Sequence, residues 1–118
     1  MFRCGVAGAP VVDWEDYDTH YTERYMDLPS ANPEGYRKAN VLTYASDLER
    51  PLLLIHGLTD DNVYFVHTLK LAGALFAAGR QYDLLPLVGT HLVYEPTMQM
   101  RLQSRIMDFL ERNLAGNK

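Results

Sequence analysis

The stretch PLLLIHGLTDDNV, residues 51–63, joins an apolar run to a polar turn. Residues 51–55 are apolar throughout and Gly57 closes the run, as expected for a short buried strand. A strand without polar alternation is typical of a parallel sheet that is covered on both faces. Directly after it come Asp60, Asp61 and Asn62. The stretch therefore predicts an α/β fold that places two carboxylates and an amide just beyond a strand end.

Strands and helices alternate on either side of this stretch. Residues 2–9 and 82–87 have the composition of two further strands. Between the last two strands, apolar residues recur at helical spacing over residues 63–76, and Gly79 is a natural helix end. Residues 98–114 predict an amphipathic helix, which we interpret as cover for the sheet. Its apolar side is expected to contain Met98, Leu102, Ile106, Phe109 and Leu114.

The segment between the first two strands, residues 11–50, is less regular. Its stretch DWEDYDTHYTERYM, residues 13–26, predicts one helix capped by Asp13 with four aromatic residues on one face. Such a stripe is more often core than binding surface. The stretch LPSANPEGY that follows has turn chemistry, so we expect no regular element there. The four aromatic residues are Trp14, Tyr17, Tyr21 and Tyr25.

The composition excludes several classes of function. The 118 residues have 47% hydrophobic and 22% charged side chains, an ordinary globular balance. A net charge of −4 with mixed signs argues against a nucleic-acid-binding surface. No apolar run is long enough for a membrane span, and no signal pattern distinguishes a periplasmic from a cytoplasmic location. The single cysteine, Cys4, excludes an internal disulfide and is interpreted as a small buried hydrophobe.

Three parallel strands make an incomplete domain. An uncovered sheet edge presents unpaired backbone groups to any neighbouring chain. The chain also opens almost within a strand. We therefore expect residues 1–118 to be the C-terminal portion of a larger, mostly parallel domain whose other strands precede residue 1.

The polar groups that follow the strands are candidates for catalysis. Open α/β sheets place their sites beyond the carboxyl ends of the strands, where Asp60, Asp61 and His91 are expected. A carboxylate that orients a histidine serves a nucleophilic serine, in the chain order Ser, Asp, His. The sequence offers the second and third members only, because no serine stands in a G-x-S-x-G turn. The serines are Ser30, Ser46 and Ser104.

Three segments carry a resemblance to a known family. These are GAPVVDWEDYDTHYTERYM, LLLIHGLTDDNV and GTHLVYEP. They resemble the C-terminal end of the peptidase domain in the dipeptidyl peptidase IV branch of the prolyl oligopeptidase family, serine peptidases of the α/β-hydrolase fold. The likeness runs from about residue 2 to residue 113. It implies removal of N-terminal dipeptides from peptides that have a free N-terminus and proline or alanine at the second position.

The resemblance also implies roles for particular residues. Asp60 would be the catalytic acid and His91 the base, while Asn62 would bind the carbonyl of the substrate's P2 residue. The walls of the apolar P1 pocket would be Val11, Trp14, Tyr17, Tyr21 and Val63, with Tyr25 packed. The nucleophile, an oxyanion-stabilising tyrosine and a pair of glutamates for the substrate amine would lie upstream. The family implies no cofactor, and contacts near the last helix imply a homodimer.

Less specific interpretations remain open for each candidate. Asp60 could simply cap a turn and His91 could be an ordinary loop histidine. His56 is interpreted as a packed, hydrogen-bonded residue, whereas His20 and His67 are expected to be exposed or to lie on a helix face. No histidine pair has metal-ligand spacing, so no metal is expected. The alternative functions are an acylaminoacyl peptidase, an oligopeptidase or an esterase of the same fold, or a non-catalytic folding or dimerisation fragment.

Overall fold

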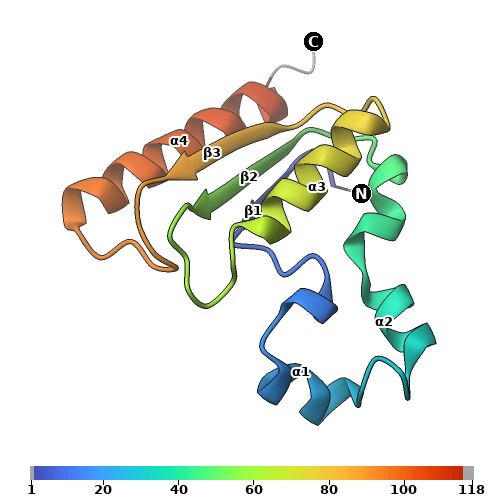
Figure 1. Cartoon of the computed structure of the whole chain (residues 1–118). Helices are drawn as coiled ribbons and strands as arrows, with labels where there is room; N and C mark the ends of the chain where they lie inside the picture. The colour runs from blue at the N-terminus through green and yellow to red at the C-terminus, as the bar shows by residue number, and fades with distance from the viewer. Residues whose placement is uncertain (1, 116–118) are drawn as a thin grey trace.

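The computed structural model describes residues 2–115, and within them a parallel sheet has the strand order β1-β2-β3 (Figure 1). The strands are β1, Gly5–Gly8, β2, Leu52–Gly57, and β3, Asp83–Leu87. All three predicted strands are present, although β1 is shorter than residues 2–9. The backbone φ of 45° at Ala9 ends β1 because that angle does not continue a strand.

Helices cover both faces of the sheet (Figure 1). The helix α4, Pro96–Ala115, packs on one face, whereas α3, Val66–Ala77, and the 3₁₀ segment η2, Val41–Asp47, pack on the other. Side chains of β2 alternate between these layers because successive strand residues point to opposite faces. Leu53 and Ile55 meet Phe109 of α4, whereas Leu54 joins the core beneath α3. Burial on both faces explains why the strand is apolar throughout.

The apolar side of α4 differs in part from the prediction. Leu102, Ile106 and Phe109 pack on the sheet as expected. Met98 and Leu114 are 53% and 48% exposed, so their inclusion was wrong. A helix of 20 residues is about 30 Å long, whereas five strand residues span about 17 Å. The two ends of α4 therefore extend past the sheet that it covers.

The aromatic segment forms two short helices instead of the single predicted helix. These are the 3₁₀ turn η1, Trp14–Asp16, and the helix α1, Thr19–Met26. Asp13 caps η1 as predicted by accepting the backbone N–H of Glu15. Asp18 caps α1 in the same way, and this second cap ends the first helical turn.

The segment that was expected to lack regular structure contains the helix α2, Pro33–Ala39, followed by η2. Pro33 occupies the first turn of α2, where a proline is tolerated because the N–H it lacks would have no helical partner. The side chains of Asn32 and Asn40 cap α2 and η2. In Figure 1, α1 and α2 project as an arm away from the sheet. No helix within residues 2–115 combines the length and apolar character needed to cross a membrane.

Candidate active site

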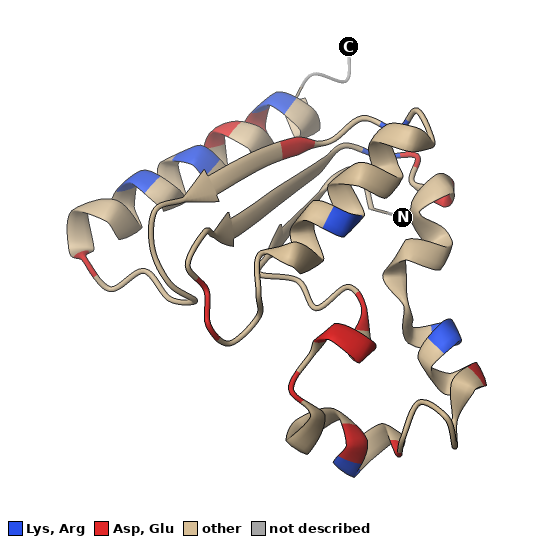
Figure 2. Cartoon of the chain, viewed as in Figure 1, with Lys and Arg blue, Asp and Glu red and all other residues tan. Residues whose placement is uncertain are grey.

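The candidate residues lie in three loops that leave the same edge of the sheet. The loop after β1 leads to the aromatic segment, the loop after β2 contains Asp60, and the loop after β3 contains His91. The strands are parallel, so their carboxyl ends and these loops meet at one edge. Figure 2 shows acidic residues at this edge, in η1 and in the turn after β2, while both signs of charge are spread over the rest of the chain.

Asp60 and His91 are hydrogen-bonded to each other. Oδ2 of Asp60 lies 2.7 Å from Nδ1 of His91. The Asp60 side chain is fully buried, whereas 33% of the His91 side chain is exposed. A carboxylate only accepts hydrogen bonds, so Nδ1 of His91 carries the proton and its Nε2 is left as the basic nitrogen. This arrangement is the one that a histidine base requires.

The turn itself holds the other oxygen of Asp60. Oδ1 accepts the backbone N–H of Asn62 at 2.9 Å and that of Val63 at 2.8 Å. Burial raises the pKa of Asp60, but the hydrogen bonds from His91 and from these two amides outweigh burial, and the pKa is lowered. The carboxylate is therefore charged and fixed in direction at neutral pH.

A close approach of two loops brings the acid to the histidine. The N–H of Leu58 donates to Leu87 O at 2.8 Å, and the N–H of Thr59 donates to Gly89 O at 3.1 Å. A Cβ on Gly57 would lie 2.3 Å from the carbonyl oxygen of Thr90. Only glycine admits this contact, which explains the glycine that closes the LLLIHG strand.

His56 is packed and hydrogen-bonded, as predicted. The ring is buried, with Nε2 2.6 Å from Val63 O and Nδ1 2.6 Å from Thr68 Oγ1. A carbonyl only accepts, so Nε2 carries a proton; the same nitrogen lies 3.3 Å from Oδ2 of Asp60. His56 thus joins the turn after β2, through Val63, to α3, through Thr68.

Asn62 is exposed beside the aromatic segment. The hydroxyl of Tyr17 donates to Oδ1 of Asn62 at 2.8 Å. This bond occupies the amide oxygen, so the amide N–H₂ remains available to an external acceptor. Val63, by contrast, is only 4% exposed, and its backbone makes the bonds described above. Asp61, the second carboxylate of the pair, is exposed.

Trp14, Tyr17 and Tyr21 form a continuous aromatic cluster, which we call the aromatic platform. The ring centroids lie 5.7 Å apart for Trp14 and Tyr17 and 5.5 Å apart for Tyr17 and Tyr21, both in edge-to-face geometry. Val11 is half-buried at the start of this segment. Tyr25 contacts Tyr21 but is 68% exposed, so the expectation that it is packed was wrong.

His67 was expected to be exposed or to lie on a helix face, and the structure places it on the buried face of α3. Its side chain is fully buried, and Nδ1 accepts the backbone N–H of Val12 at 3.1 Å. The signal was present in the sequence, because His67 stands four and eight residues before Leu71 and Leu75 and so shares their buried helix face. His20 is exposed, as expected.

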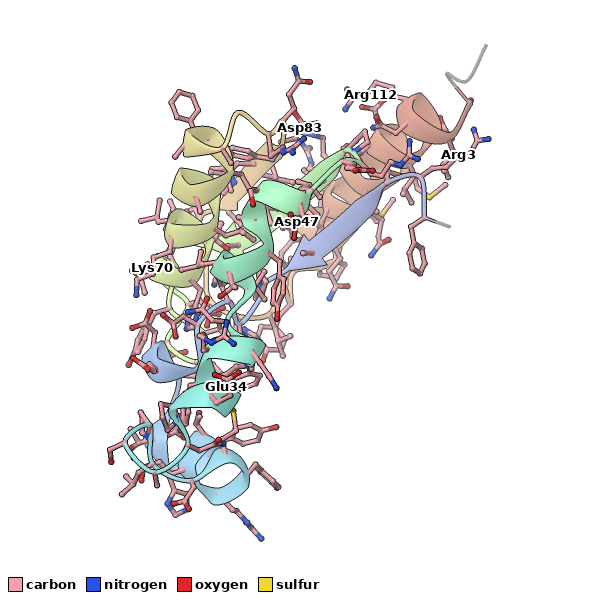
Figure 3. All side chains as sticks on the ribbon, turned by 90° about the vertical axis from the view of Figure 1, so that its right-hand side faces the viewer. Arg3, Glu34, Asp47, Lys70, Asp83 and Arg112 are labelled. Carbon is pink, nitrogen blue, oxygen red and sulfur yellow. The ribbon has the colours of Figure 1, made fainter. Side chains whose placement is uncertain are left out.

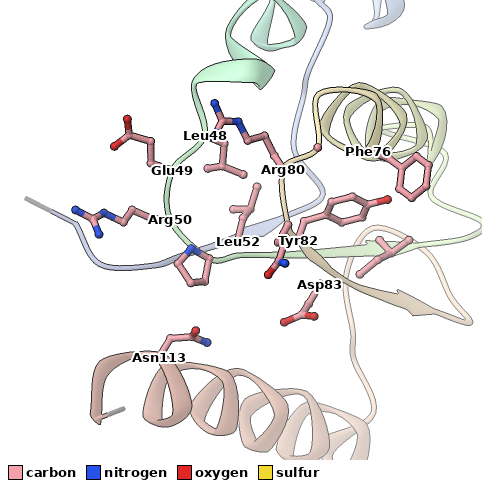
Figure 4. A pocket seen from close by; sticks show the side chains of 13 residues that line it. Leu48, Glu49, Arg50, Leu52, Phe76, Arg80, Tyr82, Asp83 and Asn113 are labelled. Carbon is pink, nitrogen blue, oxygen red and sulfur yellow. The ribbon is translucent and has the colours of Figure 1, made fainter. Parts of the chain in front are cut away.

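Two hollows lie at opposite ends of the sheet. One of about 530 Å³ adjoins His91 and is lined by Gly57, Thr90 and the sheet-facing side of α4. Another of about 1000 Å³ lies at the amino ends of β2 and β3 and is lined by Arg80 and Asp83, among others (Figure 4). The second hollow is far from the Asp60–His91 pair in the fold. Residues 2–115 contain no cluster of three or more side chains able to hold a metal ion.

The fold and the site together define a class of protein. A parallel sheet covered by helices, with an acid after one strand and a histidine after the next, is part of an α/β-hydrolase fold. The model of the prolyl oligopeptidase family, peptidase family S9, matches residues 1–117. The chain belongs to this family.

Individual relatives agree with this assignment. The chain is 39% identical to dipeptidyl peptidase 8 of Mus musculus over 98% of its own length and 14% of that protein. It is 36% identical to dipeptidyl peptidase 4 of Bos taurus over 95% of its length and 15% of that protein. The crystal structure of Porphyromonas gingivalis dipeptidyl peptidase 4 matches with a TM-score of 0.91 and 37% identity, over 95% of this chain and 16% of that one. The chain thus spans about one seventh of the relatives that it matches.

Proposed function

We propose that residues 1–118 are the C-terminal segment of the catalytic domain of a serine dipeptidyl peptidase, with the nucleophilic serine located upstream in a longer protein. The observation that carries this proposal is the 2.7 Å contact between Asp60 Oδ2 and His91 Nδ1. Ser30, Ser46 and Ser104 are exposed, and within residues 2–115 none is hydrogen-bonded to His91. The chain alone is therefore expected to have no peptidase activity.

In the proposed mechanism, Asp60 and His91 act as the acid and base of a triad. Nε2 of His91 takes the proton of the serine hydroxyl as that oxygen attacks the carbonyl carbon of the scissile bond. The same proton then passes to the leaving amine. Asp60 holds Nδ1–H and stabilises the imidazolium that forms between the two steps. The two backbone amides on Oδ1 keep the carboxylate aimed at the ring throughout.

Substrate recognition is assigned to the groups around this pair. The amide N–H₂ of Asn62, oriented by Tyr17, would donate to the carbonyl of the P2 residue. The aromatic platform, with Val11 and Val63, would contribute walls to an apolar P1 pocket suited to proline or alanine. Peptides with a free N-terminus are the proposed substrates because the relatives include dipeptidyl peptidases.

Two rival functions follow from the same segment. An acylaminoacyl peptidase, oligopeptidase or esterase would use the same acid and base but a different group for the substrate's amino end. A non-catalytic folding or dimerisation fragment would use none of these residues.

A homodimer of the longer protein is part of our proposal and is open to measurement by sedimentation.

The test is a kinetic comparison in the longer protein. We expect hydrolysis of Gly-Pro and Ala-Pro chromogenic amides, and no hydrolysis of the same amides with an acetylated N-terminus. His91→Ala should lower kcat by several orders of magnitude, and Asp60→Asn should lower it by roughly 10³- to 10⁴-fold because the favoured tautomer is lost. Asp61→Asn is the matched control, since it removes the neighbouring exposed charge.

The outcomes separate the rivals. Preference for the acetylated amides would indicate the acylaminoacyl activity instead. Near-normal turnover by the His91→Ala variant would refute the assigned pair. The 118-residue chain serves as a further control, and measurable turnover by it alone would overturn the proposal that the nucleophile lies elsewhere.

A further inference from the structure

His67 is a buried histidine that the proposed catalytic mechanism does not use. It lies in the first turn of α3, and its side chain is fully enclosed. Its Nδ1 faces two backbone donors, the N–H of Val12 at 3.1 Å and the N–H of Asp13 at 3.4 Å. These amides belong to the loop between β1 and the aromatic platform.

The two donors fix the chemical state of the ring. Both N–H groups point at the same nitrogen, so Nδ1 must present a lone pair and cannot carry a proton. The neutral ring then has its proton on Nε2. That nitrogen is buried and has no hydrogen-bond partner of good geometry within residues 2–115, although the backbone of Asp16 acts on the ring as a weak acceptor. A proton added to Nδ1 would face two amide hydrogens and break both contacts.

A fully buried histidine needs an explanation, because burying its polar ring costs stability that an apolar residue at the same position would not lose. The histidine ring supplies a hydrogen-bond acceptor for the loop that follows β1. Val12 lies between Val11 and the start of η1, whose first residue is Trp14. The helix that carries His67 begins three residues after Val63. His67 therefore joins the platform segment to the helix that follows the Asp60 turn.

Several charged and titratable groups surround the ring. Burial lowers the pKa of His67. The carboxylate and the backbone carbonyl of Asp16 and the carboxylate of Asp13 oppose this effect, while His56 on β2 lowers the pKa further. Lys70, one turn further along α3, is paired with Asp16 and lies 3.8 Å from Asp13. Figure 3 shows Lys70 on α3 close to η1. The lysine thus offsets the acidic charge that would otherwise favour a protonated ring.

We propose that His67 is a positioning residue for the substrate pocket. Its neutral ring accepts the backbone N–H groups of Val12 and Asp13, an interaction that we call the clasp. Protonation of the ring breaks the clasp and releases the segment that carries Val11 and the aromatic platform. The role in substrate binding rests on the proposed peptidase function, whereas the clasp itself does not. Substrate affinity should accordingly fall as the pH drops through the lowered pKa of His67, while the acid–base pair stays assembled because Asp60 and His91 are held by the β2–β3 loops.

Two substitutions separate the clasp from simple packing. In His67→Asn, the side-chain oxygen stands where Nδ1 was and can accept the same amides, but it does not titrate. In His67→Leu, the volume is largely kept and no acceptor remains. A role limited to filling the core predicts that Leu is the better tolerated of the two. The clasp predicts the reverse for substrate binding.

The clasp can be tested in the 118-residue chain without any activity. Nitrogen-15 spectra of the imidazole should show an unprotonated Nδ1 and a protonated Nε2 in His67 at about pH 7.5. As the pH is lowered stepwise below 6.5, the ordinary value from which the pKa of His67 is lowered, the amide signals of Val12 and Asp13 should shift in the native chain and stay constant in His67→Asn. A proton on Nδ1 at neutral pH, or amide shifts that are the same in both proteins, would overturn the proposal.

The positioning role is tested by kinetics in the longer protein. At about pH 7.5, His67→Leu should raise KM about tenfold with little change in kcat, as expected for the loss of two hydrogen bonds that support binding. His67→Asn should match the native KM there. Its KM should then rise less than the native KM as the pH falls, and the ratio of the two cancels the titration of groups that both share.

The two arms fail in distinguishable ways. Equal KM values in the native and Leu proteins at neutral pH, with both folded by circular dichroism, would overturn the positioning role even if the clasp is seen by NMR. A longer protein that cleaves no peptide amide would overturn the proposed function, while the spectra of the shorter chain would still decide whether His67 holds the loop.

Discussion

The two carboxylate oxygens of Asp60 make different contacts. Oδ1 is held by the amides of Asn62 and Val63, and Oδ2 is left for His91. The position of the residues after two strands predicted a pair of aspartates and this histidine as candidates, and the family resemblance selected Asp60 from the pair. The sequence did not reveal that the carboxylate closes its own turn. The two interpretations of Asp60, as a turn cap and as a histidine partner, are therefore compatible.

This geometry predicts an acid-sensitive stability of the 118-residue chain. The folded-state pKa of Asp60 is lowered from the ordinary value of 3.8, so its contribution is fully present above that value and is lost as the pH falls through the lowered pKa. Urea denaturation from neutral pH to about pH 3 should show the decline. Asp60→Asn should flatten it, whereas Asp61→Asn should not. An Asp60→Asn chain with the native pH profile would contradict the role of this carboxylate.

At the scale of elements, the pairing of β2 with β3 creates the site. The backbone bonds from Leu58 and Thr59 continue past the last paired residues and draw the two loops together. Gly57 sits at the narrowest point of this approach. The close approach of the loops after β2 and β3 therefore requires a residue without a side chain at position 57.

Gly57→Ala is expected to disrupt this approach. The added methyl would overlap the carbonyls of Gly89 and Thr90 and push the His91 loop away from Asp60. A misplacement of about 1 Å is expected to lower kcat/KM of the longer protein about 10²-fold. Gly73→Ala is the matched control, because a Cβ at that exposed position in α3 meets nothing within 4 Å. It should preserve activity and add about 0.5–1 kcal/mol of stability. Equal activity of both variants would contradict the argument.

The strands and the two longer helices were predictable because their apolar periodicity reflects burial on the sheet. The arm was not, because its helices are short and depend on caps. Asn32, Pro33 and Asn40 look like turn residues in the sequence, and the structure uses them as helix starts. Tyr25 was misplaced, and the burial of His67 was left open, for a related reason. Packing between elements decides whether a polar ring is buried or an aromatic ring is exposed. The local sequence pattern cannot predict this packing.

At the scale of the whole molecule, β1 pairs with β2 on one side only within residues 2–115. The N–H groups of Gly5 and Ala9 donate to β2 carbonyls or to Pro51 beside them. Because alternate residues of a strand point their N–H groups to opposite sides, the N–H of Gly8 faces the outer edge. An edge of this kind can pair with another chain.

We expect the 118-residue chain to associate with itself through this edge. Gly8→Pro removes an outward donor without taking a bond from β2, so sedimentation should show less association than for the native chain. Gly8→Ala retains the N–H and is the control, since a Cβ there meets nothing within 4 Å. A monomeric native chain at high concentration, or equal association of the two variants, would contradict this expectation.

The parallel register of β2 and β3 pairs Gly57 with Leu87, and both reactive loops start from that pair. The distance between Asp60 and His91 is thus set by the register of the sheet, in which each residue advances the strand by about 3.3 Å. A slip of a single step would exceed the length of the bond between them. In the longer protein, substitutions deep in these two strands should therefore lower the proposed peptidase activity before they unfold the domain, so that loss of this activity would be the earliest sign of damage to the core.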